Sequence, residues 1–447
     1  MPRTAELELS VAPQASRREL LGNIWQLALP AMGASGVQIV FDLTHAFWVG
    51  RLGPVKLAAL TGASFLVWIL FSLTMMLNTG FTALIARRIG AGDTPAAMRH
   101  ARQGLLLAPL AGLMLMILTL PLLPPVLAWM GFEPEARLSA WAYLHALGLG
   151  LPVIWTYSML QAIFVGRGDT RSSLRMVSLA LLLNLLLDPV LINLAGLGLR
   201  GAAVASLIAR AAGIAWGLWY LASLGWLGLE RPERRLTLQA LRIGLPHAAT
   251  GVIFCMVFVG LTPILTHFGS PALAAMGIGQ RLETVIFSVL SGLAVACTTL
   301  VGQNLGARRP DRAESLVWLA AGQAAAFCAC LMVVFWLAAP LVVPLFSQDT
   351  LTQEYGIAYL RTVSLTLVPY SCEMVFEGAF AGAGNTLPPM LIITLGTLIR
   401  IPLALFFAFT CQLGVAGVWM AVATSMTLKG CILLLWFRRG HWKEVLI

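Results

Sequence analysis

Long apolar runs separated by short polar segments extend along nearly the whole chain. A helix that crosses a bilayer needs about 20 predominantly apolar residues, and twelve windows satisfy this requirement. In the first half they lie at 22–50, 55–84, 96–129, 136–163, 172–195 and 201–223. In the second half they lie at 238–266, 271–300, 314–346, 353–379, 387–411 and 416–437. The pattern predicts an all-α, polytopic membrane protein with twelve transmembrane helices.

The two halves of the sequence match each other at a constant shift of 216 residues. Pro30 corresponds to Pro246, and Gly168 corresponds to Gly384. A fixed shift held over a long stretch indicates an internal duplication. Because each copy carries an even number of helices, both copies enter the membrane in the same direction. We therefore expect two six-helix lobes, related as a parallel repeat, with a substrate cavity between them.

The distribution of Lys and Arg predicts how the chain is divided and oriented. With the N-terminus inside, 21 Lys and Arg residues face the inside and five face the outside, which makes both termini cytoplasmic. The polar N-terminus does not resemble a signal peptide. The predicted divisions are a cytoplasmic tail at 1–21, an N-lobe at 22–223, a cytoplasmic linker at 224–237, a C-lobe at 238–437 and a tail at 438–447.

Composition supports a membrane protein and excludes several other classes. Apolar residues make up 59% of the chain and charged residues 11%, with a mean hydropathy of +0.86. A soluble domain has about 25% charged residues. The net charge of +10 would suggest nucleic acid in a soluble protein, but here the lipid bilayer is the expected partner. The seven cysteines form no CxxC motif, so we expect neither disulfides nor a metal site.

Acidic residues inside predicted spans are the strongest functional signal. Each ionised acid near the bilayer centre costs about 2.5–3.5 kcal/mol on insertion scales, so such groups face protein or water rather than lipid. Five acids fall in the spans: Asp42, Asp188, Glu283, Glu373 and Glu377. Helical spacing places Asn184 beside Asp188, Glu373 beside Glu377, and Asp42 beside His45. The positions 216 residues after Asp42 and Asp188 hold Phe258 and Ala404, so the second half lacks acids at these places. This difference favours a functional role for the two acids over a role in the scaffold. The alternative is that they form hydrogen bonds between packed helices.

Several stretches resemble the multidrug and toxic compound extrusion (MATE) family over about residues 22–437. They include LALPAMGASGVQIVFDLTHAFWVGRLGPVKLAALT, GRGDTRSSLRMVSLALLLNLLLDPVLI and GIGQRLETVIFSVLSGLAVACTTLVGQNLGARRPDRAES. The resemblance implies two six-helix lobes around a central cavity. It also implies secondary active efflux of organic cations or amphipathic drugs, by antiport with H⁺ or Na⁺ and with alternating access between the lobes.

The same resemblance implies a coupling site in the N-lobe. The matching positions are His45, Tyr143, Asn184, Asp188 and Ser206. His45 stands where the family usually has an Asp, and Asp42 lies one turn earlier. We expect this cluster to carry the coupling ion, chiefly a proton, because replacing one acid by His removes an anionic ligand for the alternative, Na⁺.

In the C-lobe, Glu373 and Glu377 predict an acidic patch on one helix face that lines the substrate cavity. Glu283 has two interpretations: a cavity-facing anion for a cationic drug, or the partner of a buried arginine such as Arg281 or Arg400. These acids would favour cations electrostatically.

Pro30 and Pro246 each interrupt the first helix of a half. They predict either transport hinges, which the resemblance implies, or static kinks.

Competing functions have weaker support. No HExxH or GxSxG motif appears, so we expect no enzyme, and no GxxxxGK[ST] phosphate loop indicates an ATP-driven pump. A lipid-linked precursor flippase would favour a basic cavity rather than intramembrane acids. We expect a monomer in the plasma (inner) membrane, with small drugs as partners, no nucleic acid, and no cofactor beyond the coupling ion.

Overall fold

The computed structural model describes residues 16–130 and 133–445, except for the side chains of Pro54 and Ala58. Most of the expected tail 1–21 lies outside the described residues, as do the last two residues of the tail 438–447. Within the described part, the first helix begins at Arg17 rather than at residue 22, and residues 224–233 of the expected linker are not helical.

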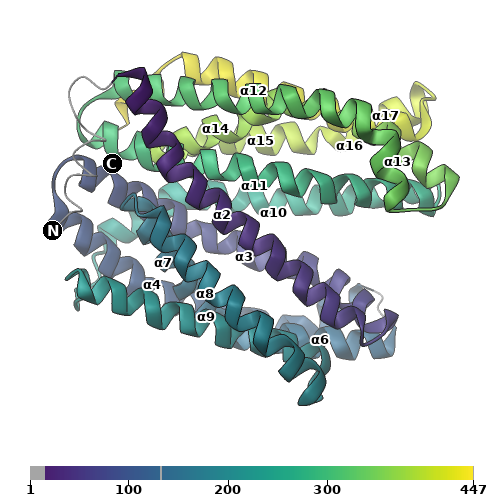
Figure 1. The fold of residues 1–447 in the computed structure, drawn as a ribbon, viewed down its shortest axis with the longest axis horizontal. Coiled ribbons are helices and arrows are strands. Elements are labelled where there is room, and N and C mark those ends of the chain that lie inside the picture. Colours follow the sequence, from purple (N-terminus) through teal and green to yellow (C-terminus); the bar gives the residue numbers. More distant parts are fainter. Residues whose placement is uncertain (1–15, 131–132, 446–447) are drawn as a thin grey trace. The chain divides into compact units, whose positions relative to one another are not determined.

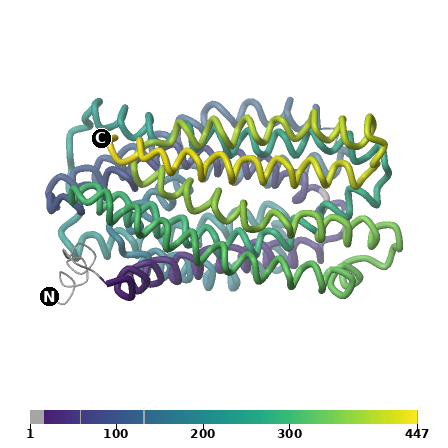
Figure 2. The backbone as a smooth tube through the Cα atoms, turned by 90° about the horizontal axis from the view of Figure 1, so that it is seen from above, coloured from purple at the N-terminus to yellow at the C-terminus, as the bar shows by residue number. Residues whose placement is uncertain are grey.

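Every regular element in the described ranges is a helix. The first half contains α2 (Arg17–Gly50), α3 (Pro54–Gly90), α4 (Thr94–Thr119), η1 (Leu120–Leu122), α5 (Leu123–Trp129), α6 (Pro134–Leu149), α7 (Leu151–Gly166), α8 (Thr170–Pro189), η2 (Val190–Leu194) and α9 (Gly198–Ser223). The second half contains α10 (Arg234–Thr266), α11 (Ser270–Gly306), α12 (Pro310–Val342), η3 (Val343–Leu345), α13 (Thr350–Ser364), α14 (Leu367–Ala383), α15 (Leu387–Leu398), α16 (Arg400–Leu405), η4 (Phe406–Thr410), α17 (Gly414–Arg438) and η5 (His441–Glu444). Within each half, the long helices run roughly along one direction (Figures 1 and 2).

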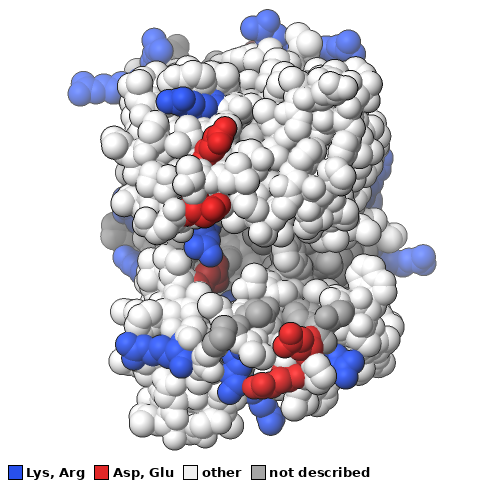
Figure 3. All heavy atoms as spheres, turned by 90° about the vertical axis from the view of Figure 1, so that its right-hand side faces the viewer, with Lys and Arg blue, Asp and Glu red and all other residues white. Residues whose placement is uncertain are grey.

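Ten helices among the described residues are long and apolar enough to cross a membrane, and α6 with α7, bent by 57°, makes an eleventh span. The twelfth expected span, 353–379, falls on α13 and α14. These helices have 15 and 17 residues and carry charged groups such as Glu354 and Arg361, so neither qualifies by length and composition. Figure 3 looks along the long helices onto their ends, where charged side chains are scattered among uncharged ones.

The predicted duplication is visible in local features that recur at matching positions of the two halves. The five-residue π-helical turns η2 and η4 begin at Val190 and Phe406, which differ by the 216-residue shift. The hydroxyl of Thr82 donates to the carbonyl of Ala162 at 3.2 Å, and Thr298 makes the corresponding bond to Gly378 at 2.9 Å. The predicted parallel repeat is therefore confirmed, because unusual local features recur at the same register in both halves.

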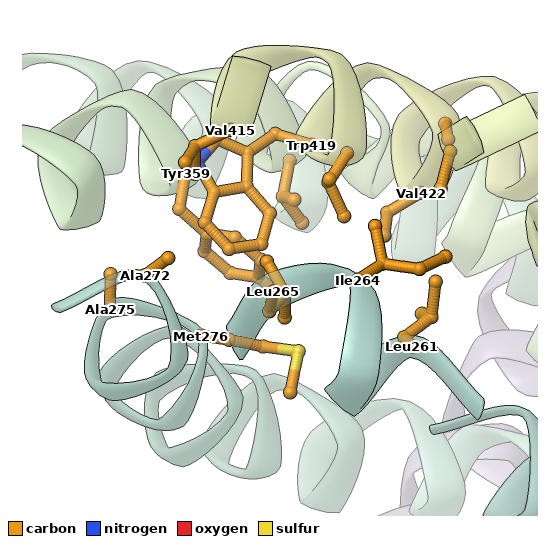
Figure 4. Close-up of a cluster of buried hydrophobic side chains, with 14 of the residues drawn as sticks. Leu261, Ile264, Leu265, Ala272, Ala275, Met276, Tyr359, Val415, Trp419 and Val422 are labelled. Atoms are coloured by element: carbon orange, nitrogen blue, oxygen red, sulfur yellow. The ribbon is translucent and has the colours of Figure 1, made fainter. Parts of the chain in front are cut away.

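Buried apolar side chains fill the interior of the second half. Tyr359 of α13 packs edge-on against Trp419 of α17, with ring centroids 4.8 Å apart. Leu265 of α10 and Ala275 of α11 pack in the same cluster (Figure 4). This packing fixes α13 and α17, two helices that carry polar side chains of the functional site.

The described chain packs as two units. One spans Leu29–Leu245 and is called the N-lobe unit; the other takes the described residues up to Ala28 and from Pro246 onward and is called the C-lobe unit. Helices α2 and α10 therefore each belong to both units. The boundary between the units falls close to Pro30 in α2 and at Pro246 in α10. A proline inside a helix removes a backbone hydrogen bond, so Pro30 and Pro246 weaken their helices near the boundary between the two units.

The close approach of α14 to α11 generates a stability prediction. A Cβ at Gly382 would collide with the backbone of Thr298, whereas a Cβ at Gly322 of α12 would meet nothing within 4 Å. We expect Gly382→Ala to lower the free energy of unfolding by about 1–3 kcal/mol through overpacking. Gly322→Ala, the control, should leave stability equal or higher because Ala favours helix. Thermal unfolding of the purified variants measures both, and equal melting temperatures would contradict the prediction.

Candidate functional site

A buried acid–histidine cluster lies within the N-lobe unit. The Oδ2 atom of Asp188 on α8 lies 3.6 Å from the Nε2 atom of His45 on α2. The side-chain amide of Asn184 donates to the Oδ1 atom of the same carboxylate at 3.1 Å. Asn184 and Asp188 are fully buried, and His45 is 6% exposed. The structure thus brings three of the predicted residues together in one contact group.

Local structure explains how α8 presents this carboxylate. Asp169 caps the start of α8 by accepting from the backbone amide of Ser172, so the helix begins cleanly after the Gly168 turn. Asp188 occupies the last regular turn, directly before Pro189 and the π-helical turn η2. Single π-helical turns inside helices frequently occur at functional sites.

The remaining predicted N-lobe residues are placed around this cluster rather than in it. Asp42 is exposed, and its carboxylate accepts from the side chain of Gln38 on the same helix at 3.1 Å. Tyr143 is buried on α6, within electrostatic range of Asp42 and Asp188. Ser206 faces a different group, because its hydroxyl accepts a hydrogen bond from the Arg210 guanidinium.

Arg210 of α9 is a further buried polar group of the N-lobe unit and lies within the predicted span 201–223. It is 6% exposed, and its guanidinium lies over the rings of Phe41 and Phe71, at 5.0 and 5.6 Å from their centroids. It also lines a small pocket within the N-lobe unit, together with Val37, Gln38, Phe41, Tyr157, Val177 and Ala180.

The C-lobe unit contains a buried ion pair that the sequence did not reveal. Lys429 of α17 donates to Glu373 of α14 at 2.8 Å, and the two residues are 3% and 4% exposed. The distribution of Lys and Arg counted Lys429 among the residues that face the inside. In the structure, Lys429 lies inside the membrane-spanning helix α17. Gly396 of α15 makes room for its stem, since a Cβ there would collide with the Lys429 side chain.

The other two predicted site acids of this lobe also have partners. Glu377 lies 3.4 Å from the Nδ1 atom of His247, so the expected acidic face of α14 carries a basic neighbour at each glutamate. Glu283 accepts from the hydroxyl of Tyr359 at 2.5 Å. Of the two arginines considered for it, buried Arg400 acts on Glu283 electrostatically, whereas Arg281 is exposed.

The two lobes hold different chemistry at equivalent positions. Tyr143 and Tyr359 correspond in the repeat, but Asn184 corresponds to Arg400. The partners of His45 and Asp188 at the same shift are Leu261 and Ala404, both buried and apolar. The acid–histidine cluster is therefore a property of the N-lobe alone and not a requirement of the duplicated scaffold.

The buried ion pair generates a prediction that separates charge burial from packing. Lys429→Met leaves the Glu373 carboxylate buried without its cation, so we expect a loss of about 3–5 kcal/mol in the free energy of unfolding. The double variant Lys429→Met with Glu373→Met removes both charges and should recover most of that loss. Thermal melting of the purified proteins compares them. A single variant as stable as the parent would contradict this account.

Comparison with known proteins gives a consistent family assignment. The MatE family profile matches residues 30–190 and again 246–406. A relative from Thermotoga maritima, described as "Probable multidrug resistance protein NorM", is 27% identical over 443 residues, covering 97% of this chain and 95% of that protein.

Three solved structures are also similar along their length. One is described as an "Outward-facing conformation of a multidrug resistance MATE family transporter of the MOP superfamily"; it is 25% identical, covers 99% of both chains and has a TM-score of 0.91. A MATE protein solved in bent and straight conformations is 26% identical, covers 97% of both chains and has a TM-score of 0.89. Because the family profile matches both halves in the repeat register and together covers most of the chain, this protein belongs to the MatE family of transporters.

Proposed function

We propose that this protein is a proton-coupled efflux transporter that exports amphipathic drugs across the plasma membrane. The observation that carries the coupling part is the buried cluster of His45, Asn184 and Asp188, which the equivalent positions of the C-lobe lack. An acid inside a membrane span is energetically costly, so a buried acid there marks a functional site. The family assignment and the names of the similar proteins support drug export as that function.

The proposed cycle depends on proton binding at Asp188. When its carboxylate is ionised, it accepts the amide hydrogen bond of Asn184 and can attract a protonated His45. A proton arriving from outside neutralises the carboxylate, which weakens both interactions. Since the proton then binds the two conformations of the transporter with different affinities, its binding shifts their populations. His45 and Asp188 would titrate as a coupled pair.

Sodium is the second candidate for the coupling ion. Carboxylate and amide oxygens can both coordinate a hard cation. In this cluster, however, His45 contributes nitrogen in place of a second acid, and Asp42 is engaged with Gln38. This chemistry supports the proton over sodium.

The prolines of α2 and α10 are the proposed hinges of the conformational change. Each proline stands where its helix passes from one packed unit to the other. The existence of a similar MATE protein in bent and straight conformations supports bending at such a point. We further propose that the protein acts as a monomer, needs no cofactor beyond the coupling ion, and has both termini in the cytoplasm, since most of its Lys and Arg then face inward.

The N-lobe cluster predicts a specific loss of coupling. Asp188→Asn cannot exchange a proton but keeps a polar side chain of the same shape, so we expect export driven by a pH gradient to be abolished while insertion and folding persist. Asp93→Asn is the matched control, because Asp93 caps α4 and Asn caps helices equally well. Export of a fluorescent amphiphile is measured in proteoliposomes with pH and sodium gradients imposed separately. Undiminished export by Asp188→Asn under a pH gradient, or strict sodium dependence of the parent, would overturn the proton assignment.

The half-buried acids of the C-lobe predict charge selection among substrates. Neutralising Glu283 or Glu377 removes negative charge, so Glu283→Gln and Glu377→Gln should reduce export of a cationic amphiphile more than that of a matched neutral one. Glu354→Gln, at an exposed position of α13, serves as the control. Equal losses for both compounds would argue against charge-based recognition by these residues.

A further inference from the structure

Arg102 of α4 holds the linker that follows α9 against the N-lobe unit, to which the linker belongs. Its guanidinium donates to the carbonyl of Trp226 at 3.1 Å, to the carbonyl of Gly225 at 3.4 Å and to the carboxylate of Glu230 at 3.0 Å. A planar guanidinium can serve several acceptors at once, and its charge strengthens each bond. These acceptors lie along residues 225–230, which are not helical, so one side chain fixes the path of this part of the linker.

Trp226 anchors the same segment by packing. It is 5% exposed, and the guanidinium of Arg167 lies over its ring, 4.2 Å from the centroid. A Cβ at Gly228 would collide with the guanidinium of Arg102, so this glycine allows the linker to pass close to α4. The linker is therefore packed on the N-lobe unit instead of hanging from it as a free tether.

Gln103, the next residue of α4, ties the end of the linker to the first turn of α10. Its side-chain amide donates to the carbonyl of Glu233 at 2.7 Å and to the hydroxyl of Thr237 at 2.8 Å. Its side-chain carbonyl accepts from the backbone amide of Glu233 at 3.3 Å. Gln103 is buried, so these bonds also satisfy polar groups that have no access to water.

Close backbone contacts anchor the rest of the first turns of α10. A Cβ at Gly80 of α3 would collide with the backbone of Ala240, and a Cβ at Gly244 would collide with the backbone of Met76 on α3. Two helices approach each other this closely only where a side chain is missing. The anchored stretch therefore reaches almost to Pro246, the residue at which the chain passes into the C-lobe unit.

The two polar side chains of α4 are specific to the first half. Arg102 and Gln103 correspond in the repeat to Trp318 and Leu319. The C-lobe therefore has neither a guanidinium nor a side-chain amide at these places. The duplicated frame does not require them, which favours a role that belongs to the half followed by the linker.

We propose that residues 225–245 form a rigid arm of the N-lobe, clamped by Arg102 and Gln103, and that the arm delivers the relative motion of the lobes to α10 at Pro246. The inference rests on the proposed hinge at this proline and deepens it. A free tether would absorb a displacement of the lobes along its own length. A clamped arm cannot, so the displacement reaches the first point beyond it where α10 lacks a backbone hydrogen bond. Arg102 and Gln103 are thus positioning residues for the hinge.

Limited proteolysis tests the clamp without relying on transport. Arg234 and Arg235 lie exposed within the arm and are sites for trypsin. Cleavage requires the chain to open locally, and its rate follows the population of the open form when reclosing is fast. The full-length protein is treated with trypsin in phosphatidylcholine nanodiscs, and the two fragments are identified by mass. The variants are Arg102→Met, Arg102→Lys and Gln103→Leu, and Arg99→Met, at an exposed position of the same helix, is the control.

Arg102→Met and Gln103→Leu should each speed cleavage in the arm about tenfold or more, because each removes several hydrogen bonds, some from a charged donor. Arg102→Lys keeps the charge but not the fork and should have a smaller effect. Arg99→Met should match the parent. A parent cut as fast as Arg102→Met and Gln103→Leu would overturn the clamp. Should either variant fail to fold, equal cleavage of the parent and the remaining clamp variants would count against it in the same way.

Export kinetics test whether the clamp serves the hinge. In proteoliposomes, Arg102→Met should lower the maximal export rate of a fluorescent amphiphile severalfold and leave its KM unchanged, because the arm touches the moving helix and not the substrate. Full export by a variant whose arm is cut rapidly would overturn the transmission of motion to Pro246. A parent that exports nothing would refute the proposed function, whereas slow cleavage of that parent and rapid cleavage of Arg102→Met would leave the clamp standing.

Discussion

The bilayer interior supplies no hydrogen-bond partners, and the rest of this structure depends on that constraint. Backbone groups satisfy it by forming helices throughout the membrane-spanning part. Polar side chains satisfy it through specific partners, such as a carboxylate with an amide and an imidazole, a lysine with a glutamate, and a glutamate with a phenol. Each partnership ties two helices, or two turns of one helix, into a fixed relation. Function and architecture are therefore determined by the same small set of polar contacts.

Duplication followed by divergence explains how these contacts came to differ between the lobes. The backbone of the two halves still agrees at its unusual points, such as the π-helical turns at Val190 and Phe406. The polar side chains do not agree. The N-lobe pairs Asp188 with His45, whereas the C-lobe pairs Glu373 with Lys429 and Glu377 with His247, at positions that do not correspond in the repeat. The duplicated frame therefore encloses different polar groups in its two halves.

Much of the fold follows from sequence because hydropathy and the repeat are local or periodic signals. The pairing of Asn184 with Asp188 was equally predictable, since four-residue spacing on a helix makes neighbours. Contacts between helices distant in sequence were not. Lys429 lies within the predicted span 416–437 but was counted with the inside-facing basic residues, and nothing in the sequence connects it to Glu373, 56 residues away. Likewise, the sequence could not show that Ser206 faces Arg210 instead of the acid cluster. Such contacts depend on the relative rotation of packed helices.

The space beneath Lys429 makes two positions of this lobe depend on each other. In the N-lobe the corresponding pair is Ala180 and Gly213; in the C-lobe it is Gly396 and Lys429. A methyl group at position 396 would occupy the volume of the lysine stem, so the lysine in this position depends on the glycine opposite. The glycine does not depend on the lysine in return, because a glycine facing a small residue leaves only a gap.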